Sequence, residues 1–206
     1  MRSRSFRGVH RPPFTRRHLV EPLESRTLLT TAALTGTSGN DVFEIAADWS
    51  AGTYQFWCGN TLQAEVPKSQ GIAFTVVGNG GHDELDVDPQ VSVTLTNDPG
   101  ADGTKLDLRL FGYADFHDAA QLAQFQSIYP AGKGTSFTID PDGTRLVEAD
   151  SLTIDQFANG ALMGRINLND NAMIIHNPDA TTAAAVQANI QAFVANSVNG
   201  GYANGA

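Results

Sequence analysis

The chain has 206 residues, with 13 Lys and Arg against 22 Asp and Glu and a formal net charge of −9. This acidic balance argues against a nucleic-acid partner, because such proteins use clustered Lys and Arg to neutralise phosphates. The sequence contains no apolar run near the roughly 20 residues that a membrane-spanning helix needs, so we expect no transmembrane segment.

Basic residues gather at the start of the chain. Seven of the thirteen lie in the first 26 residues against two acids, which leaves six basic and twenty acidic residues for the rest. A basic leader on an acidic body is typical of an export segment. The apolar run after Arg26 is shorter than the usual signal-peptide core of about 7–15 residues, so a disordered basic tail that binds acidic surfaces is the alternative. We predict a disordered export or sorting leader over residues 1–33.

A short motif in this leader resembles a known family. Its residues, in order, are Glu21, Pro22, Leu23, Glu24, Arg26, Leu28 and Leu29. They resemble the LEPR-XLL domain, an N-terminal signature of large surface and extracellular proteins of planctomycete bacteria, although Ser25 stands where the family often has Pro. The resemblance implies that these residues form a sorting motif for the export machinery and that the protein is extracellular or at the cell surface.

The body, residues 34–178, is predicted to consist of short strands. The β-rich runs are 41–46, 53–58, 61–65, 73–77, 84–87, 91–96, 105–110, 136–139, 144–147, 151–154, 165–168 and 173–176. Clusters of Gly, Asn, Asp and Pro, which favour turns, separate them. A dozen short strands with regular turn signals predict an all-β sandwich, barrel or solenoid.

Internal similarity favours the solenoid. Residues 36–45 align with 78–87 at an offset of 42, and residues 102–106 align with 142–146 at an offset of 40. Self-similarity at a fixed spacing is typical of stacked repeat units. We predict a right-handed parallel β-helix, or β-solenoid, and keep a β-sandwich as the alternative, because strand number alone does not separate the two.

The second half of the chain carries another resemblance. From Ala114 onward, strands lead into Leu168-Asn-Asp-Asn171, then a helical segment and a Gly200-Gly-Tyr202 ending. This order looks like the autotransporter-like β-helix segments of planctomycete surface proteins. The resemblance implies strand for residues 116–128, which also fit a helix.

One helix is predicted, over residues 179–196. Asp179 is a good N-cap, and Val186, Ile190, Phe193 and Val194 form one apolar stripe. We expect this helix to pack on a face or end of the solenoid, with a partner-binding helix as the alternative. The Gly-rich tail ends at Ala206 without the polar cap that a solenoid needs, so for 179–206 we expect the close of a leading part of a longer protein, or a gene cut short.

Two Gly–Asp turns are the candidate metal site. Residues 78–85 partly match the nonapeptide of calcium-binding RTX β-rolls, a resemblance that makes Asp41 and Asp83 calcium ligands. RTX sites need tandem copies, whereas these lie 42 residues apart, and each alone offers fewer than the six to eight oxygens that Ca²⁺ takes. We therefore expect no cofactor and turn-capping roles for both residues, with calcium as the alternative.

The sequence carries no recognisable catalytic motif. His82, His117 and His176 are separated along the chain, without His-x-x-x-His or Gly-x-Ser-x-Gly spacing. Cys58, the one cysteine, lies at a strand end and is expected to be a half-buried hydrophobe. We expect a protein that is not an enzyme.

Aromatic residues at positions 49, 54 and 57 raise the question of sugar stacking. Tyr54 alternates with Phe56 on one strand face, which favours a core role. We expect an exported structural or adhesive protein whose partners are the export machinery and surface polysaccharide or other surface proteins. The alternatives are a carbohydrate-active β-helix enzyme and an RTX-like calcium-binding β-roll.

Overall fold

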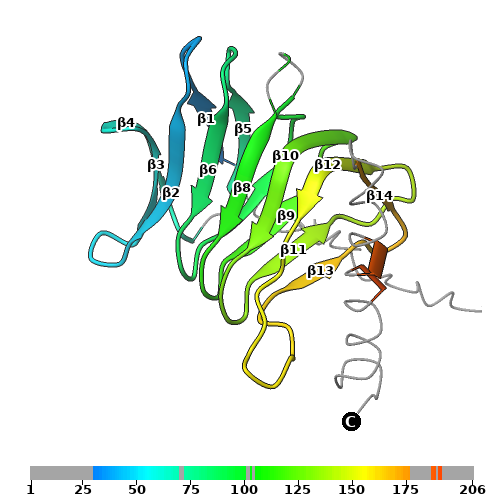
Figure 1. Cartoon of the computed structure of the whole chain (residues 1–206). Coiled ribbons are helices and arrows are strands. Elements are labelled where there is room, and N and C mark those ends of the chain that lie inside the picture. The colour runs from blue at the N-terminus through cyan, green and yellow to red at the C-terminus, as the bar shows by residue number, and fades with distance from the viewer. Residues whose placement is uncertain are drawn as a thin grey trace, which may run out of the picture.

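A computed structural model describes residues 30–69, 72–100, 103, 105–176, 187–188 and 190–191. This part of the chain forms fourteen strands (Figure 1). They are β1 Thr30–Thr35, β2 Val42–Asp48, β3 Thr53–Cys58, β4 Thr61–Pro67, β5 Ile72–Val77, β6 Asp83–Val87, β7 Ser92–Leu95, β8 Leu106–Leu110, β9 Asp115–Asp118, β10 Leu122–Pro130, β11 Ser136–Ile139, β12 Leu146–Leu152, β13 Arg165–Asn167 and β14 Ala172–Ile175.

The strands form two sheets that face each other (Figure 1). The six-stranded sheet has the order β1-β5-β7-β9-β11-β13, and the eight-stranded sheet has the order β14-β12-β10-β8-β6-β2-β3-β4. All pairings are parallel except β2 with β3 and β3 with β4, which are antiparallel. The predicted all-β class is confirmed, in a sandwich-like arrangement of two sheets.

Apart from the β3–β4 hairpin, the chain alternates between the sheets, one strand in each. We call such a pair of consecutive strands a rung: β1–β2, β5–β6, β7–β8, β9–β10, β11–β12 and β13–β14. In the six-stranded sheet Val93 lies beside Phe116, and Phe116 lies beside Phe137. Each rung therefore lies in parallel register on the one before it.

The two sequence offsets have different meanings in the structure. Phe43 pairs with Leu85, so the offset of 42 is the register between β2 and β6, and it is long because the β3–β4 hairpin lies between them in the chain. The offset of 40 relates the start of β8 to that of β12, which do not pair, because β10 lies between them. The repeating unit is thus shorter than either offset predicted.

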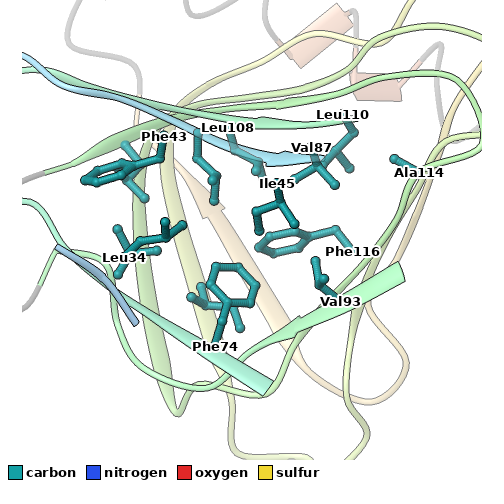
Figure 2. Close-up of a cluster of buried hydrophobic side chains, with 14 of the residues drawn as sticks. Leu34, Phe43, Ile45, Phe74, Val87, Val93, Leu108, Leu110, Ala114 and Phe116 are labelled. Carbon is teal, nitrogen blue, oxygen red and sulfur yellow. The ribbon is translucent and has the colours of Figure 1, made fainter. Parts of the chain in front are cut away.

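The core lies between the sheets. Alternate residues of β6 and β8 are buried, as expected for strands with one face on the core and one outside. Buried side chains from both sheets meet there, Phe43 and Leu108 from one and Phe74 and Phe116 from the other (Figure 2). Phenylalanine rings form a continuous row, with centroids 6.0 Å apart for Phe74 and Phe116 and 5.7 Å for Phe116 and Phe137. Each such side chain contributes about 1.5–3 kcal/mol through burial.

One end of the stack is covered by the β3–β4 hairpin, which contacts β1. The side-chain amide of Gln63 in β4 donates to the carbonyl of Thr35 at 2.6 Å and accepts from its N–H at 2.7 Å. Because unpaired strand edges promote aggregation, this contact protects the outer edge of β1. The first described strand, β1, begins at Thr30, inside the range expected for the leader.

The structure tests several of the predicted strands and part of the predicted helix. Residues 116–128 contain strands β9 and β10, separated by residues 119–121, and the separate runs 144–147 and 151–154 each overlap the single strand β12. Of the predicted helix 179–196, residues 187, 188, 190 and 191 are described and helical; the remainder lies outside the described residues. No helix in the described part of the chain is long and apolar enough to cross a membrane.

Candidate ligand-binding groove

The structure brings Asp41 and Asp83 together at corresponding turns of the first two rungs. Asp41 Oδ2 accepts from the backbone N–H of Thr37 at 2.6 Å and from its hydroxyl at 3.0 Å. Asp83 Oδ1 accepts from the N–H of Asp41 at 2.9 Å. Both carboxylates therefore accept from backbone N–H groups, Asp41 within its own turn and Asp83 from the turn of the preceding rung. No group of three or more His, Cys, Asp and Glu within the described ranges is arranged to hold a metal ion; the calcium alternative stays a prediction.

Close backbone packing explains the glycines of these turns. Gly81 has a φ of 93°, and a Cβ there would collide with the carbonyl of Gly39 in the preceding rung. Asn40 Oδ1 accepts from the N–H of His82 at 2.9 Å. The Gly–Asp repeat is therefore explained by stacking of one turn on the next.

Cys58 is half-buried, as predicted, and its thiol lies 3.7 Å from Asp41 Oδ1. Burial and the negative charge of Asp41 raise the pKa of this thiol. A raised pKa disfavours the reactive thiolate, which agrees with a packing role. The sorting-motif residues Glu21, Pro22, Leu23, Glu24, Arg26, Leu28 and Leu29 lie outside the described residues.

A buried acid at the end of β9 is a feature that no local sequence pattern predicted. Asp118 has no exposed surface; its Oδ1 accepts from the N–H of Ala120 at 2.9 Å, and its Oδ2 has no hydrogen-bond partner in the described part of the chain. Burial raises the pKa of Asp118 to about 7, although the Ala120 hydrogen bond and the charge of Arg145 act in the opposite direction. This group is a source of pH-dependent stability.

The outer face of the eight-stranded sheet is acidic. Glu84 and Asp86 project from β6 and share Arg109 of β8, whose Nε lies 2.9 Å from Asp86 Oδ1. Desolvation by burial, together with the charges of Asp88 and Asp86, raises the pKa of the neighbouring Glu44. On this face the positive charge of Arg109 neutralises only part of the negative charge of the surrounding carboxylates.

The outer face of the six-stranded sheet carries a polar groove of about 420 Å³. It is lined by Tyr54, Lys68, Ser69, Ile72, Ser92, Val93, Thr94, His117 and Asp140. Strand alternation accounts for its polar floor, because Val93 and Phe116 point into the core and their neighbours therefore point outward. Parallel register then places Thr94 of β7 beside His117 of β9, which lies beside Thr138 of β11.

His117 bridges two carboxylates at one side of this groove. Its Nε2 lies 3.1 Å from Asp115 Oδ2, and its Nδ1 lies 3.2 Å from Asp140 Oδ1. Partial burial lowers the pKa of His117, but hydrogen bonds to Asp140 and Asp115 and their charges outweigh it, so the pKa is raised. His117, which belongs to no recognisable sequence motif, therefore lies at the centre of a charged cluster in the structure.

The hairpin forms the other side of the groove. Lys68, just after β4, places its Nζ 3.3 Å from the ring centroid of Trp49 and 5.3 Å from that of Tyr54. Its ammonium is buried and has no hydrogen-bond partner among the described residues. Tyr54 is 9% exposed, as its predicted core role requires, and its hydroxyl accepts from the N–H of Ser92 at 3.3 Å. Trp49, in contrast, is 64% exposed.

No family model, curated protein or solved structure matches this chain. The groove is lined by hydroxyl groups, the imidazole of His117 and the carboxylate of Asp140. The indole of Trp49 contacts Lys68, which lines the groove, and the carboxylate of Asp115 contacts His117. Such side chains can bind a hydroxyl-rich ligand by stacking and by hydrogen bonds.

Proposed function

We propose that this chain is an exported, non-catalytic structural or adhesive protein of the cell surface or extracellular space. The LEPR-XLL-like motif from Glu21 to Leu29 is its sorting signal, which the export and sorting machinery recognises. Its body is a rigid stack that presents polar faces to the surroundings. The stacking of rungs in parallel register is the observation that carries the structural role, because it builds stiffness in a chain with a single cysteine.

We further propose that the two sheets are the walls of a right-handed β-solenoid. Support comes from the alternation of strands between sheets and from parallel pairing of each strand with its equivalent in the next rung. Connections between parallel strands of one sheet are right-handed in about 98% of cases. A repeated parallel register between successive rungs is expected of a solenoid, whereas the packing of two sheets in a sandwich does not require it.

Deletion of one rung tests this architecture. Removing residues 116–136 joins Asp115 directly to Phe137, the register partner of Phe116. A solenoid is expected to lose stability yet keep a β-type circular dichroism spectrum and a cooperative melt, because each unit contacts only its neighbours. The control lacks 116–126, which removes part of a rung and disrupts the alternation of sheets, and is expected to unfold. Equal loss of structure in both variants would contradict the solenoid.

The export proposal is tested by fractionation of cells that express the full chain with a C-terminal tag. In a planctomycete host we expect the tagged protein in the surface or medium fraction. The variant Leu28→Asp with Leu29→Asp is expected to stay inside. Ser25→Ala changes a position in the same segment where this chain already differs from the family, and it is expected to be exported normally. Retention of the unchanged protein in the cytoplasm would refute the proposal.

A carbohydrate-active enzyme is the second candidate, favoured by the cluster of Asp115, His117 and Asp140 in a groove. Paired acidic groups with an imidazole can transfer protons. Release of new chain ends from a polysaccharide by the purified protein, abolished in His117→Ala, would select the enzyme over the adhesive protein.

A further inference from the structure

We propose that the groove on the six-stranded sheet binds a neutral polysaccharide that extends onto the exposed face of Trp49, which stands beside the groove in contact with the lining residue Lys68. This inference rests on the proposed adhesive function and names its ligand class and its site. The recognising groups are the Trp49 indole and the polar side chains of Thr94, His117 and Asp140.

Trp49 is held in a defined position although it is largely exposed. It lies in the turn between β2 and β3, and the buried ammonium of Lys68 contacts one face of its ring at 3.3 Å from the centroid. A cation against an indole face contributes about 0.5–2 kcal/mol. Since the side chain is still 64% exposed, the indole offers a flat apolar surface to solvent. The C–H face of a sugar ring is a suitable partner for such a surface, since aromatic side chains favour flat apolar contacts.

The polar wall of the groove suits hydroxyl groups. His117 engages one oxygen from each of Asp115 and Asp140, and these side chains remain 39% and 37% exposed. The second oxygen of each carboxylate can accept a hydrogen bond from a ligand hydroxyl. Thr94 adds a group that both donates and accepts. Because the carboxylates are fixed by His117, little side-chain entropy is lost when a ligand binds.

Charge favours a neutral ligand over an acidic one. Lys68, which lines the groove, has its ammonium against the Trp49 ring, whereas Asp140 lines the groove and Asp115 stands beside it. The body as a whole is acidic, with twenty Asp and Glu against six Lys and Arg. The imidazole of His117 also lines the groove, but it already pairs with both Asp115 and Asp140. An anionic polysaccharide would therefore meet two carboxylates whose cationic partner is shared between them, which is unfavourable.

The test measures binding of the purified full-length chain to soluble polysaccharides by affinity electrophoresis and by tryptophan fluorescence. The neutral probes are mixed-linkage β-glucan, xylan and galactomannan, and the acidic probe is polygalacturonate. We expect retardation by at least one neutral probe and none by polygalacturonate. The fluorescence change should persist in Trp57→Phe, because Trp49 reports the binding.

Variants locate the site. Trp49→Ala is expected to weaken binding at least tenfold, and Asp140→Asn to weaken it several-fold. Phe157→Ala is the matched control and should bind normally, because it removes another exposed aromatic side chain, 37% exposed, that lies between β12 and β13 rather than beside Lys68. Circular dichroism melts of each variant verify that the fold is retained.

Three results would overturn the inference: no binding to any neutral probe, binding to polygalacturonate alone, or binding that Trp49→Ala leaves unchanged. Its failure is distinct from failure of the proposed function, which is judged by cell fractionation. An exported protein that binds none of these polymers refutes only the ligand assignment, whereas a cytoplasmic protein that binds them refutes only the export proposal.

Discussion

Replacing Asp118 by Asn should stabilise the protein at alkaline pH. The side chain is fully buried, and Asn keeps its shape and the oxygen that accepts from the Ala120 N–H. What Asn removes is the ability to carry a charge in the core. The folded protein holds the pKa of Asp118 at about 7, against an ordinary value of 3.8.

The raised pKa of Asp118 determines the direction and the size of the expected change in the free energy of unfolding. A raised pKa in the folded state means that folding disfavours the ionised form, so no penalty exists below about pH 4 and the penalty grows until pH 7. At about 1.4 kcal/mol per pH unit, the penalty is roughly 1.5 kcal/mol at pH 5 and roughly 4 kcal/mol at pH 8. The cost of burying the new amide group is the same at both pH values. The free energy of unfolding of Asp118→Asn relative to the unchanged protein should therefore rise by about 2–3 kcal/mol from pH 5 to pH 8.

Urea unfolding followed by circular dichroism at the two pH values measures this difference. Asp142→Asn is the control, because this exposed carboxylate has its pKa lowered by hydrogen bonds from Thr144. Its replacement should not stabilise the protein at pH 8. If the unchanged protein and Asp118→Asn show parallel stability across this pH range, the assigned penalty is refuted.

Three further outcomes are expected. Gly81→Ala should destabilise by more than about 2 kcal/mol, because it adds a collision to the strain of a positive φ, whereas Gly52→Ala, with a φ of 72° and open space, should cost about 1 kcal/mol by urea unfolding. Phe116→Ala, which removes the centre of the aromatic row, should cost about 3–5 kcal/mol in the same assay. Millimolar Ca²⁺ should leave the melting temperature unchanged, because Asp41 and Asp83 are engaged by backbone groups; a rise that EDTA reverses would identify them as ligands.

The strands and turns could be predicted from sequence because their signals are local. Alternation in segments such as 84–87 and 106–110 marks one buried face, and Gly81 marks a turn. The similarity at an offset of 42 correctly predicted the register between β2 and β6. It reflects the close packing of Gly81 in the second turn on Gly39 in the first. The true length of the repeating unit could not be predicted, because residues that pair between successive rungs share only apolar character. Val93, Phe116 and Phe137 are examples.

The groove could not be predicted, because its residues come together only across rungs. Asp115 and His117 are two residues apart on one strand, but Asp140 reaches His117 from 23 residues further along. The contact of Lys68 with Trp49 depends on how the hairpin folds back. Likewise, the burial of Asp118 follows from its place at the end of a strand inside the stack, which no local pattern records.

The parallel register also determines how the body responds to force. The first and last described strands, β1 and β14, belong to the first and last rungs, so tension applied through the chain ends acts along the direction of the inter-strand hydrogen bonds. Loaded in this direction, the rungs are expected to peel away one after another rather than shear together. Extension in an optical trap would then proceed as a series of small steps, so that tension is relieved gradually while the remaining rungs stay folded.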